Sequence, residues 1–133
     1  MNTAEDLLKF GRSLMGDGAE EIALRSAASR IYYAAFHLCK RYADNYCTLL
    51  RDEDKVGGEH AQLFIRLTEN SRVVALDDSL SELAETAKKM RSIRVKADYK
   101  LDINFLQNEA KRCSSYFDDI RASCDEVDQV SKP

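Results

Sequence analysis

The chain contains very few residues that interrupt helices. Its one proline, Pro133, is the last residue, and four of its five glycines fall in two short segments, Gly16–Gly18 and Gly57–Gly58. Proline and glycine are the residues least compatible with a helix interior, so long stretches are left in which helices can continue. A chain of 133 residues can bury one hydrophobic core but is too short to expect two. We therefore expect one all-α domain over residues 1–128 and a disordered tail over residues 129–133.

Apolar residues recur at helical spacing in five segments. Thr3 and Asp6 have the spacing of a helix start, and Gly16–Gly18 ends this first helix. A long central helix continues to Tyr46 or beyond. Three further helices are expected: a short one over Glu59–Thr68, a fourth that starts with a capping box of Ser79 and Glu82, and a last one whose apolar stripe begins at Ile103. The pattern predicts a bundle in which amphipathic helices bury their apolar faces against one another.

The central helix has a polar edge opposite its apolar face. The members of this edge lie three or four residues apart, so they share one side of the helix over about five turns; they are Ser26, Arg30, Tyr33, His37, Arg41 and Asp44. An arginine and a histidine two turns apart on one edge of a core helix are the clearest chemical feature of the sequence.

The fourth helix places an arginine in its apolar seam. Arg94 follows a run of inward positions that includes Leu83 and Met90. A buried guanidinium needs a carboxylate, a wet cleft or a ligand as partner, because an unpaired buried charge costs several kcal/mol. Asp98 lies one turn later and Arg91 one turn earlier, so the three residues share a face.

Charge and cysteine content limit the class of protein. The net charge of −3 and the pI near 5.4 argue against binding to nucleic acid by bulk charge, although a local basic edge stays open. The four cysteines lie eight or more residues apart without a Cys-x-x-Cys pair, so we expect no metal site and no cofactor. Cys39, Cys113 and Cys124 are expected as buried apolar thiols. Together with the lack of a signal peptide or a long uncharged apolar run, they favour a cytoplasmic protein without a membrane segment.

Three motifs in this order resemble the HEPN family, in particular its small stand-alone bacterial and archaeal members. The most specific motif is the run Ser26–His37, which contains Ser-x-x-Tyr-Tyr-Ala-x-Phe-His. Gly58-Glu59-His60 with Leu63-Phe64 and the segment Arg91–Tyr99 support it. The resemblance extends from about Leu7 to Ile120.

The resemblance implies an up-and-down four-helix bundle with one short additional helix, assembled as a homodimer. Many HEPN proteins are metal-independent ribonucleases of toxin–antitoxin or phage-defence systems, and a nucleotidyltransferase often serves as the antitoxin partner. Their catalytic motif is an arginine followed, after four to six residues, by a histidine. Two protomers usually bring these motifs together in one cleft.

In this chain the pair with suitable spacing is Arg30 with His37, because the late segment reads Ala97-Asp98-Tyr99 and has no histidine. We expect His37 to act as general acid or base toward a ribose hydroxyl, while Arg30 and Arg94 stabilise phosphate charge. The other residues expected in the composite cleft are Tyr33, which would position or stack on a base, together with Arg91, Asp98 and Tyr99.

Other interpretations stay open. His37 could be hydrogen-bonded inside the bundle, Arg30 could form a salt bridge with Asp98, and His60 is expected as a surface or capping residue in its first turn. At the level of function, the alternative is a non-catalytic HEPN adaptor that binds a nucleotide, an RNA or a partner protein. A plain helical interaction module is a third interpretation.

Overall fold

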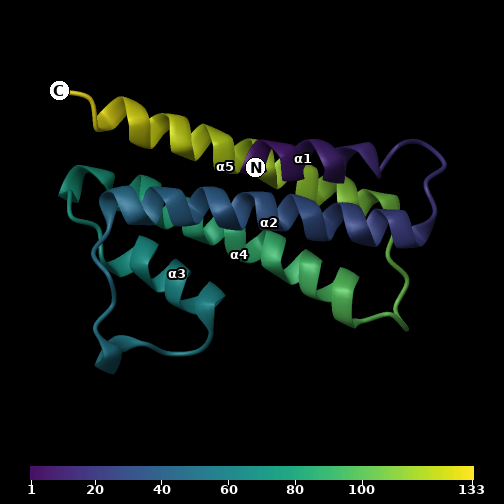
Figure 1. Ribbon diagram of the computed structural model, residues 1–133, viewed down its shortest axis with the longest axis horizontal. Helices are drawn as coiled ribbons and strands as arrows, with labels where there is room; N and C mark the ends of the chain where they lie inside the picture. The colour runs from purple at the N-terminus through teal and green to yellow at the C-terminus, as the bar shows by residue number, and fades with distance from the viewer.

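The computed structural model describes all 133 residues, and its regular structure is helical throughout (Figure 1). The five α-helices are α1 (Ala4–Ser13), α2 (Glu21–Tyr46), α3 (Glu59–Glu69), α4 (Asp77–Tyr99) and α5 (Gln107–Val130), with short 3-10 turns η1 (Asp52–Asp54) and η2 (Val74–Leu76). No strand is present, and a single isolated β-bridge pairs Cys47 with Ser71. The expected all-α class is confirmed.

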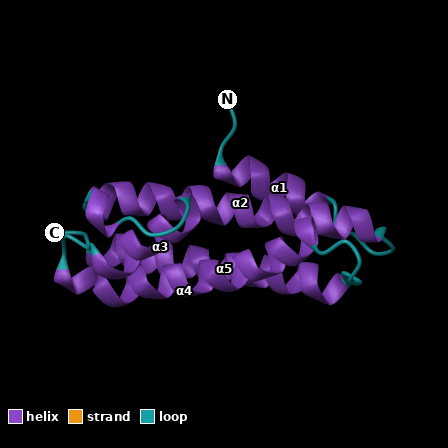
Figure 2. Ribbon diagram, turned by 90° about the horizontal axis from the view of Figure 1, so that it is seen from below, coloured by secondary structure: helices purple, strands orange, loops and turns teal.

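The long helices α2, α4 and α5 lie side by side, and each packs against the other two. The chain reverses direction from α1 to α2 and again from α4 to α5, as Figures 1 and 2 show. The short helix α1 folds back along α2, and α3 packs against α4 and α2. Helix α2 therefore contacts all four other helices.

Thr3 starts α1 as expected. Its hydroxyl accepts a hydrogen bond from the Asp6 N–H at 3.2 Å, and the Asp6 carboxylate accepts one from the Thr3 N–H at 2.8 Å. This reciprocal pair satisfies two backbone donors that the first turn would otherwise leave free.

Two other helix boundaries differ from expectation. The expected capping box of Ser79 and Glu82 is wrong, because the η2 turn leads directly into α4 at Asp77 and Ser79 is buried inside the helix. The last helix begins at Gln107 instead of near Ile103, since the Glu109 carboxylate accepts the Leu106 N–H at 2.9 Å and so fixes the first turn there. At its other end α5 continues to Val130.

Gly11, the glycine outside the two loop segments, lets α1 approach α2 closely. A Cβ atom at this position would lie 2.8 Å from Ile31 Cγ1 and 3.1 Å from the Ala27 carbonyl oxygen. These distances are shorter than normal carbon contacts, so a side chain at residue 11 would push the two helices apart.

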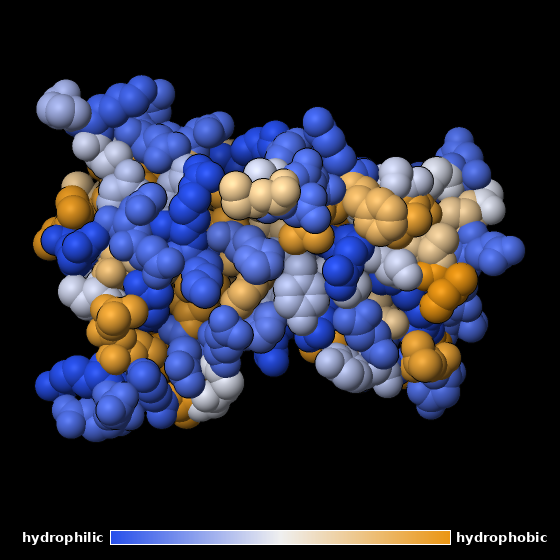
Figure 3. Space-filling view, in the orientation of Figure 1, coloured by the Kyte–Doolittle hydropathy of each residue, from blue (hydrophilic) through white to orange (hydrophobic).

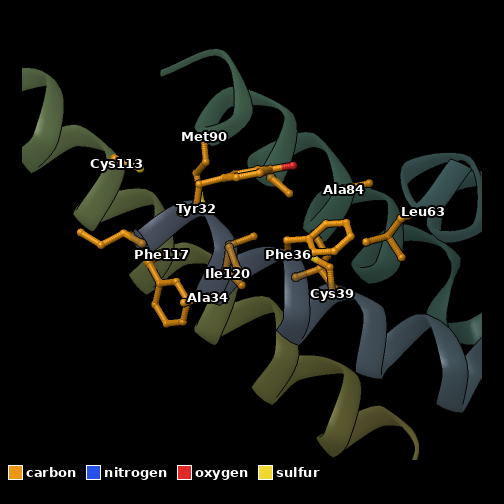
Figure 4. Packing of buried hydrophobic residues seen from close by; sticks show 14 of the residues in the cluster. Tyr32, Ala34, Phe36, Cys39, Leu63, Ala84, Met90, Cys113, Phe117 and Ile120 are labelled. Carbon is orange, nitrogen blue, oxygen red and sulfur yellow. The ribbon is translucent and has the colours of Figure 1, made fainter. Parts of the chain in front are cut away.

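One cluster of 30 buried apolar residues joins all five helices. Figure 4 shows Tyr32 beside Met90, and Phe36 on the side that faces Leu63. All four cysteines are free and buried, including Cys47. Burial raises the pKa of the Cys113 and Cys124 thiols to about 12, so they stay protonated and unreactive near neutral pH.

Arg25 ties the start of α2 to the end of α4. Its Nη1 donates hydrogen bonds to the carbonyl oxygens of Lys96, Ala97 and Lys100 at 3.0 to 3.2 Å. Its Nη2 donates to Glu21 Oε1 at 3.1 Å and to the Ile103 carbonyl. The side chain thereby satisfies the Ala97 carbonyl, which has no backbone donor at the end of α4, and adds a second donor to the Lys96 and Lys100 carbonyls.

The face drawn in Figure 3 is mostly hydrophilic, and hydrophobic side chains appear on it in small groups. None of the five helices combines the length and the apolar character needed to cross a lipid bilayer.

Candidate functional site

Polar and aromatic side chains of α2, α3 and α4 meet around the ring of Tyr33. The guanidinium carbon of Arg94 lies 5.0 Å from the centre of this ring and that of Arg30 lies 5.5 Å from it. The His60 ring is 5.9 Å away and meets the tyrosine edge-on. We call this group the Tyr33 cluster; its members are Ser29, Arg30, Tyr32, Tyr33, His60, Arg94, Asp98 and Tyr99.

Arg94 is held by hydrogen bonds on two of its three nitrogens. Nε donates to Asp98 Oδ2 at 2.8 Å, and Nη2 donates to the Tyr33 hydroxyl at 2.7 Å. The Tyr99 hydroxyl lies at 3.5 Å from Nη2, and its ring is 5.2 Å from the guanidinium carbon. The seam arginine therefore has the carboxylate partner that its position requires.

Asp98 is fixed in turn by α2, because Ser29 Oγ donates to the same Oδ2 atom at 3.0 Å. The expected alternative of a salt bridge between Arg30 and Asp98 is wrong: the carboxylate pairs with Arg94 on its own helix. Arg30 instead lies against the Tyr33 ring, where a cation is attracted to the electron-rich ring face.

The remaining nitrogen of Arg94 is open to solvent. Nη1 has no hydrogen-bond partner. Every buried side-chain nitrogen or oxygen atom in the chain does have a partner, so Nη1 is not a buried atom. Nη1 must therefore be reachable by water, although the residue as a whole is only 9% exposed. The same reasoning applies to Asp98 Oδ1. The cluster thus presents one fixed donor group and one fixed acceptor to the outside.

His60, the second residue of α3, is part of the cluster, so the expectation of a surface or capping role is wrong. Its ring stacks on Tyr32 with centroids 5.5 Å apart and lies 4.4 Å from the ring centre of Phe36. Its Nδ1 is 2.5 Å from the Tyr32 hydroxyl. Burial lowers the pKa of His60 below its ordinary value, and the nearby charges of Arg91 and Arg94 lower it further.

His37 lies elsewhere on α2. It is exposed, its nearest aromatic ring is that of Phe36 at 5.6 Å, and it makes no hydrogen bond or ion pair. The alternative of a histidine hydrogen-bonded inside the bundle is therefore wrong. Two helical turns, about 10 Å along the axis, separate it from Arg30. Within one chain the structure joins Arg30, Tyr33, Arg94, Asp98 and Tyr99 but leaves out His37.

Arg91 lies on the edge of a groove between α3 and α4 with a volume of about 630 Å³. Lys88 and Lys100 also line this groove, no carboxylate does, and Phe64, Ile65 and Val95 supply apolar surface. A chain of net negative charge therefore carries a locally basic edge next to the Tyr33 cluster.

No group of three or more histidine, cysteine, aspartate or glutamate side chains is placed to hold a metal ion. Comparison with family models, with curated proteins and with solved structures gave no match. The structure thus places the chain among all-helical proteins. Its distinguishing feature is a solvent-reachable cluster of two arginines, a histidine and tyrosines. What the cluster binds has to be argued from its chemistry.

Proposed function

We propose that the protein is an RNA-directed, HEPN-like protein that binds a phosphate of single-stranded RNA at the Tyr33 cluster. The observation that carries the proposal is the Arg94 side chain, which is fixed on one side and leaves Nη1 open on the other. An arginine whose orientation is already fixed loses little conformational entropy when it binds a phosphate, and its planar fork suits phosphate oxygens.

Two further features support RNA as the ligand. Tyr99 is 69% exposed beside Arg94, so its ring is available for stacking on an unpaired base. Arg30 lies over the Tyr33 ring and brings a second positive charge to the cluster. A phosphate at Arg94 and a base on Tyr99 would together fit a single-stranded segment.

In this proposal the protein is cytoplasmic and forms a homodimer, and a nucleotidyltransferase is the candidate antitoxin partner, as the resemblance to HEPN proteins implies. The binding version of the function does not need His37. The ribonuclease version, a metal-independent toxin or defence enzyme, needs His37 or another imidazole at the bound phosphate. Because His37 lies outside the cluster of its own chain, it could act only where a second protomer completes the cleft.

The test is binding of a 5′-labelled single-stranded RNA, followed by fluorescence anisotropy at several salt concentrations. Arg94→Met should lower the affinity at least tenfold, which corresponds to about 1.4 kcal/mol. The matched control is Arg121→Met, since Arg121 also combines an ion pair, with Glu5 at 2.8 Å, and an aromatic neighbour, Phe117 at 5.3 Å, but lies on α5. Equal losses in the two variants, or no RNA binding by the unchanged protein, would contradict the proposal.

The same samples separate binding from cleavage. Intact RNA after long incubation at high protein concentration supports the adaptor, whereas cleavage that His37→Ala removes without loss of helicity supports the ribonuclease.

A further inference from the structure

We infer that His60 is the imidazole of this site and that Tyr32 holds it as the Nε2–H tautomer, so that it donates a hydrogen bond to an anionic oxygen of the bound phosphate. The inference deepens the proposed function and rests on it for the identity of the phosphate as part of RNA. The sequence predicts His37 on α2 for this role, and the inference gives the role to His60 on α3.

The hydrogen bonding of Tyr32 determines the tautomer. The Tyr32 side chain is fully buried, and its hydroxyl has one partner, Nδ1 of His60. If Nδ1 carried the ring proton, the hydroxyl hydrogen of Tyr32 would need a second acceptor, and none is present. Burial also raises the pKa of Tyr32, so its hydroxyl keeps its proton. Tyr32 therefore donates to Nδ1, and the ring proton of His60 resides on Nε2.

The surroundings of His60 keep the ring neutral. Arg91 and Arg94 face it from α4, Tyr32 and Tyr33 from α2, and on its own helix Glu59 is the one neighbouring carboxylate. Burial and the two arginine charges favour the uncharged form and outweigh Glu59, so the pKa lies below the ordinary 6.5. A neutral N–H next to Arg94 can donate a hydrogen bond without the repulsion that an imidazolium would bring.

Nε2 has no partner inside the protein, and since no buried polar side-chain atom is unpaired, it too is reachable by solvent. His60 and Arg94 contact the same Tyr33 ring, at 5.9 and 5.0 Å. Two donors without protein partners therefore belong to residues that contact one tyrosine, and an anionic oxygen is the acceptor that a cation and a neutral N–H both favour. A phosphodiester oxygen fits, because it accepts from both a cation and a neutral N–H.

Nuclear magnetic resonance can test the tautomer directly, because the chain has only two histidines. Long-range ¹H–¹⁵N spectra at pH 7 should show one ring with a protonated Nε2 and an unprotonated Nδ1, and these signals should be absent in His60→Ala. Tyr32→Phe removes the hydrogen bond but keeps the ring packing, so it should give a mixture of tautomers in a folded protein. A ring with the proton on Nδ1, or a His60 that is charged at pH 7, would overturn the inference.

Ligand contact is tested with two probes, inorganic phosphate and an RNA hexamer with 2′-O-methyl groups that cannot be cleaved. Either anion at Nε2 should shift the His60 signals and raise the pKa of His60, because a nearby negative charge favours the protonated ring. His60→Ala should weaken binding of the hexamer about tenfold, the size expected for a hydrogen bond to a charged group. Arg121→Met, which alters an ion pair with Glu5 outside the Tyr33 cluster, is the control and should leave the affinity unchanged.

The outcomes separate this inference from the proposed function. If Arg94→Met abolishes RNA binding while His60→Ala has no effect, the role of His60 is refuted and the RNA proposal stands. If phosphate shifts the His60 signals but no RNA binds, His60 belongs to an anion site and the RNA proposal is wrong. If neither probe shifts these signals and no RNA binds, both are wrong.

Discussion

Arg25 and Arg94 are the two buried arginines of the chain, with exposed fractions of 5% and 9%, yet their hydrogen bonding differs. Both terminal nitrogens of Arg25 are engaged, with four carbonyl groups and the Glu21 carboxylate. Arg94 uses Nε and Nη2 but leaves Nη1 open. Burial alone therefore does not separate the two side chains. Arg25 has only its Nε without a partner, whereas Arg94 has a terminal nitrogen without one, which is the basis of the ligand role that we propose for it.

The difference follows from what each guanidinium faces. Arg25 points at the carboxyl end of α4, where several carbonyl groups lack helical partners and the helix dipole favours a cation. Arg94, five residues before the end of α4, faces two hydroxyl groups and one carboxylate, which cannot use all five of its N–H groups. The end of α4 therefore engages both terminal nitrogens of Arg25, whereas the surroundings of Arg94 engage only one and leave the other without a partner.

The largest predicted effect is on stability at Arg25. Arg25→Met keeps much of the side-chain volume but leaves the Ala97 carbonyl oxygen without a donor and removes one of the two donors to each of the Lys96 and Lys100 carbonyl oxygens. Loss of a buried charge that is held by several hydrogen bonds typically costs about 3 kcal/mol or more. Arg94→Met should cost only about 1 to 2 kcal/mol, because Asp98 keeps the Ser29 hydroxyl and is partly exposed. Chemical denaturation followed by circular dichroism measures both values.

For RNA binding, the larger effect should come from substitution of Arg94 and the smaller effect from substitution of Arg25. Arg94→Met should lose RNA affinity, and Arg25→Met, studied at a temperature where it is folded, should keep it. Equal destabilisation by the two substitutions, or loss of RNA binding in both, would remove the distinction between them.

Most of the fold could be predicted from the sequence, because helix formation depends on local features. The rarity of glycine and proline indicated long helices, and apolar spacing located all five. The errors at the starts of α4 and α5 arose where a turn or a side chain outside the periodic pattern sets the first residue. Neither the η2 turn nor the hydrogen bond of Glu109 to the Leu106 N–H can be recognised from apolar spacing.

The site was predictable to the extent that its contacts are local. Arg94 and Asp98 are four residues apart on one helix, and that spacing was enough to pair them. His60 could not be found in this way, because its partner Tyr32 lies 28 residues earlier and belongs to another helix. The sequence predicts His37 as a site residue because it shares an edge of the helix with Arg30. Helix periodicity does not show, however, which part of that edge the neighbouring helices cover. The Gly58-Glu59-His60 motif was the one signal in the sequence that pointed to His60.

A smaller effect is predicted for the hydroxyl of Tyr33. Tyr33→Phe keeps the ring that Arg30, His60 and Arg94 contact but removes the acceptor for Arg94 Nη2, so Arg94 becomes less well oriented. The stability loss should be about 1 kcal/mol, and RNA affinity should fall severalfold. Tyr42→Phe is the matched control, since the Tyr42 hydroxyl donates to Asp128 at 2.6 Å away from the cluster. It should cost similar stability without changing the affinity, and an equal loss of affinity in both variants would show that the effect is not specific to the site.

The smallest predicted effect is a pH dependence at the Arg25 end of the molecule. The Phe105 N–H and the Arg25 guanidinium both donate hydrogen bonds to Glu21 and so lower the pKa of this carboxyl below its ordinary 4.5. Because the folded pKa is then below the unfolded one, ionised Glu21 stabilises the folded state above about pH 4.5, and this contribution is lost as the pH falls through the folded pKa. Glu21→Gln should therefore lower the melting temperature at pH 6 but have progressively less effect toward pH 3. Because Glu21→Gln alters no part of the Tyr33 cluster, the RNA affinity of this variant at pH 7 should equal that of the unchanged protein. A stability difference that does not depend on pH would show that the charge of Glu21 does not help Arg25 to bind the end of α4.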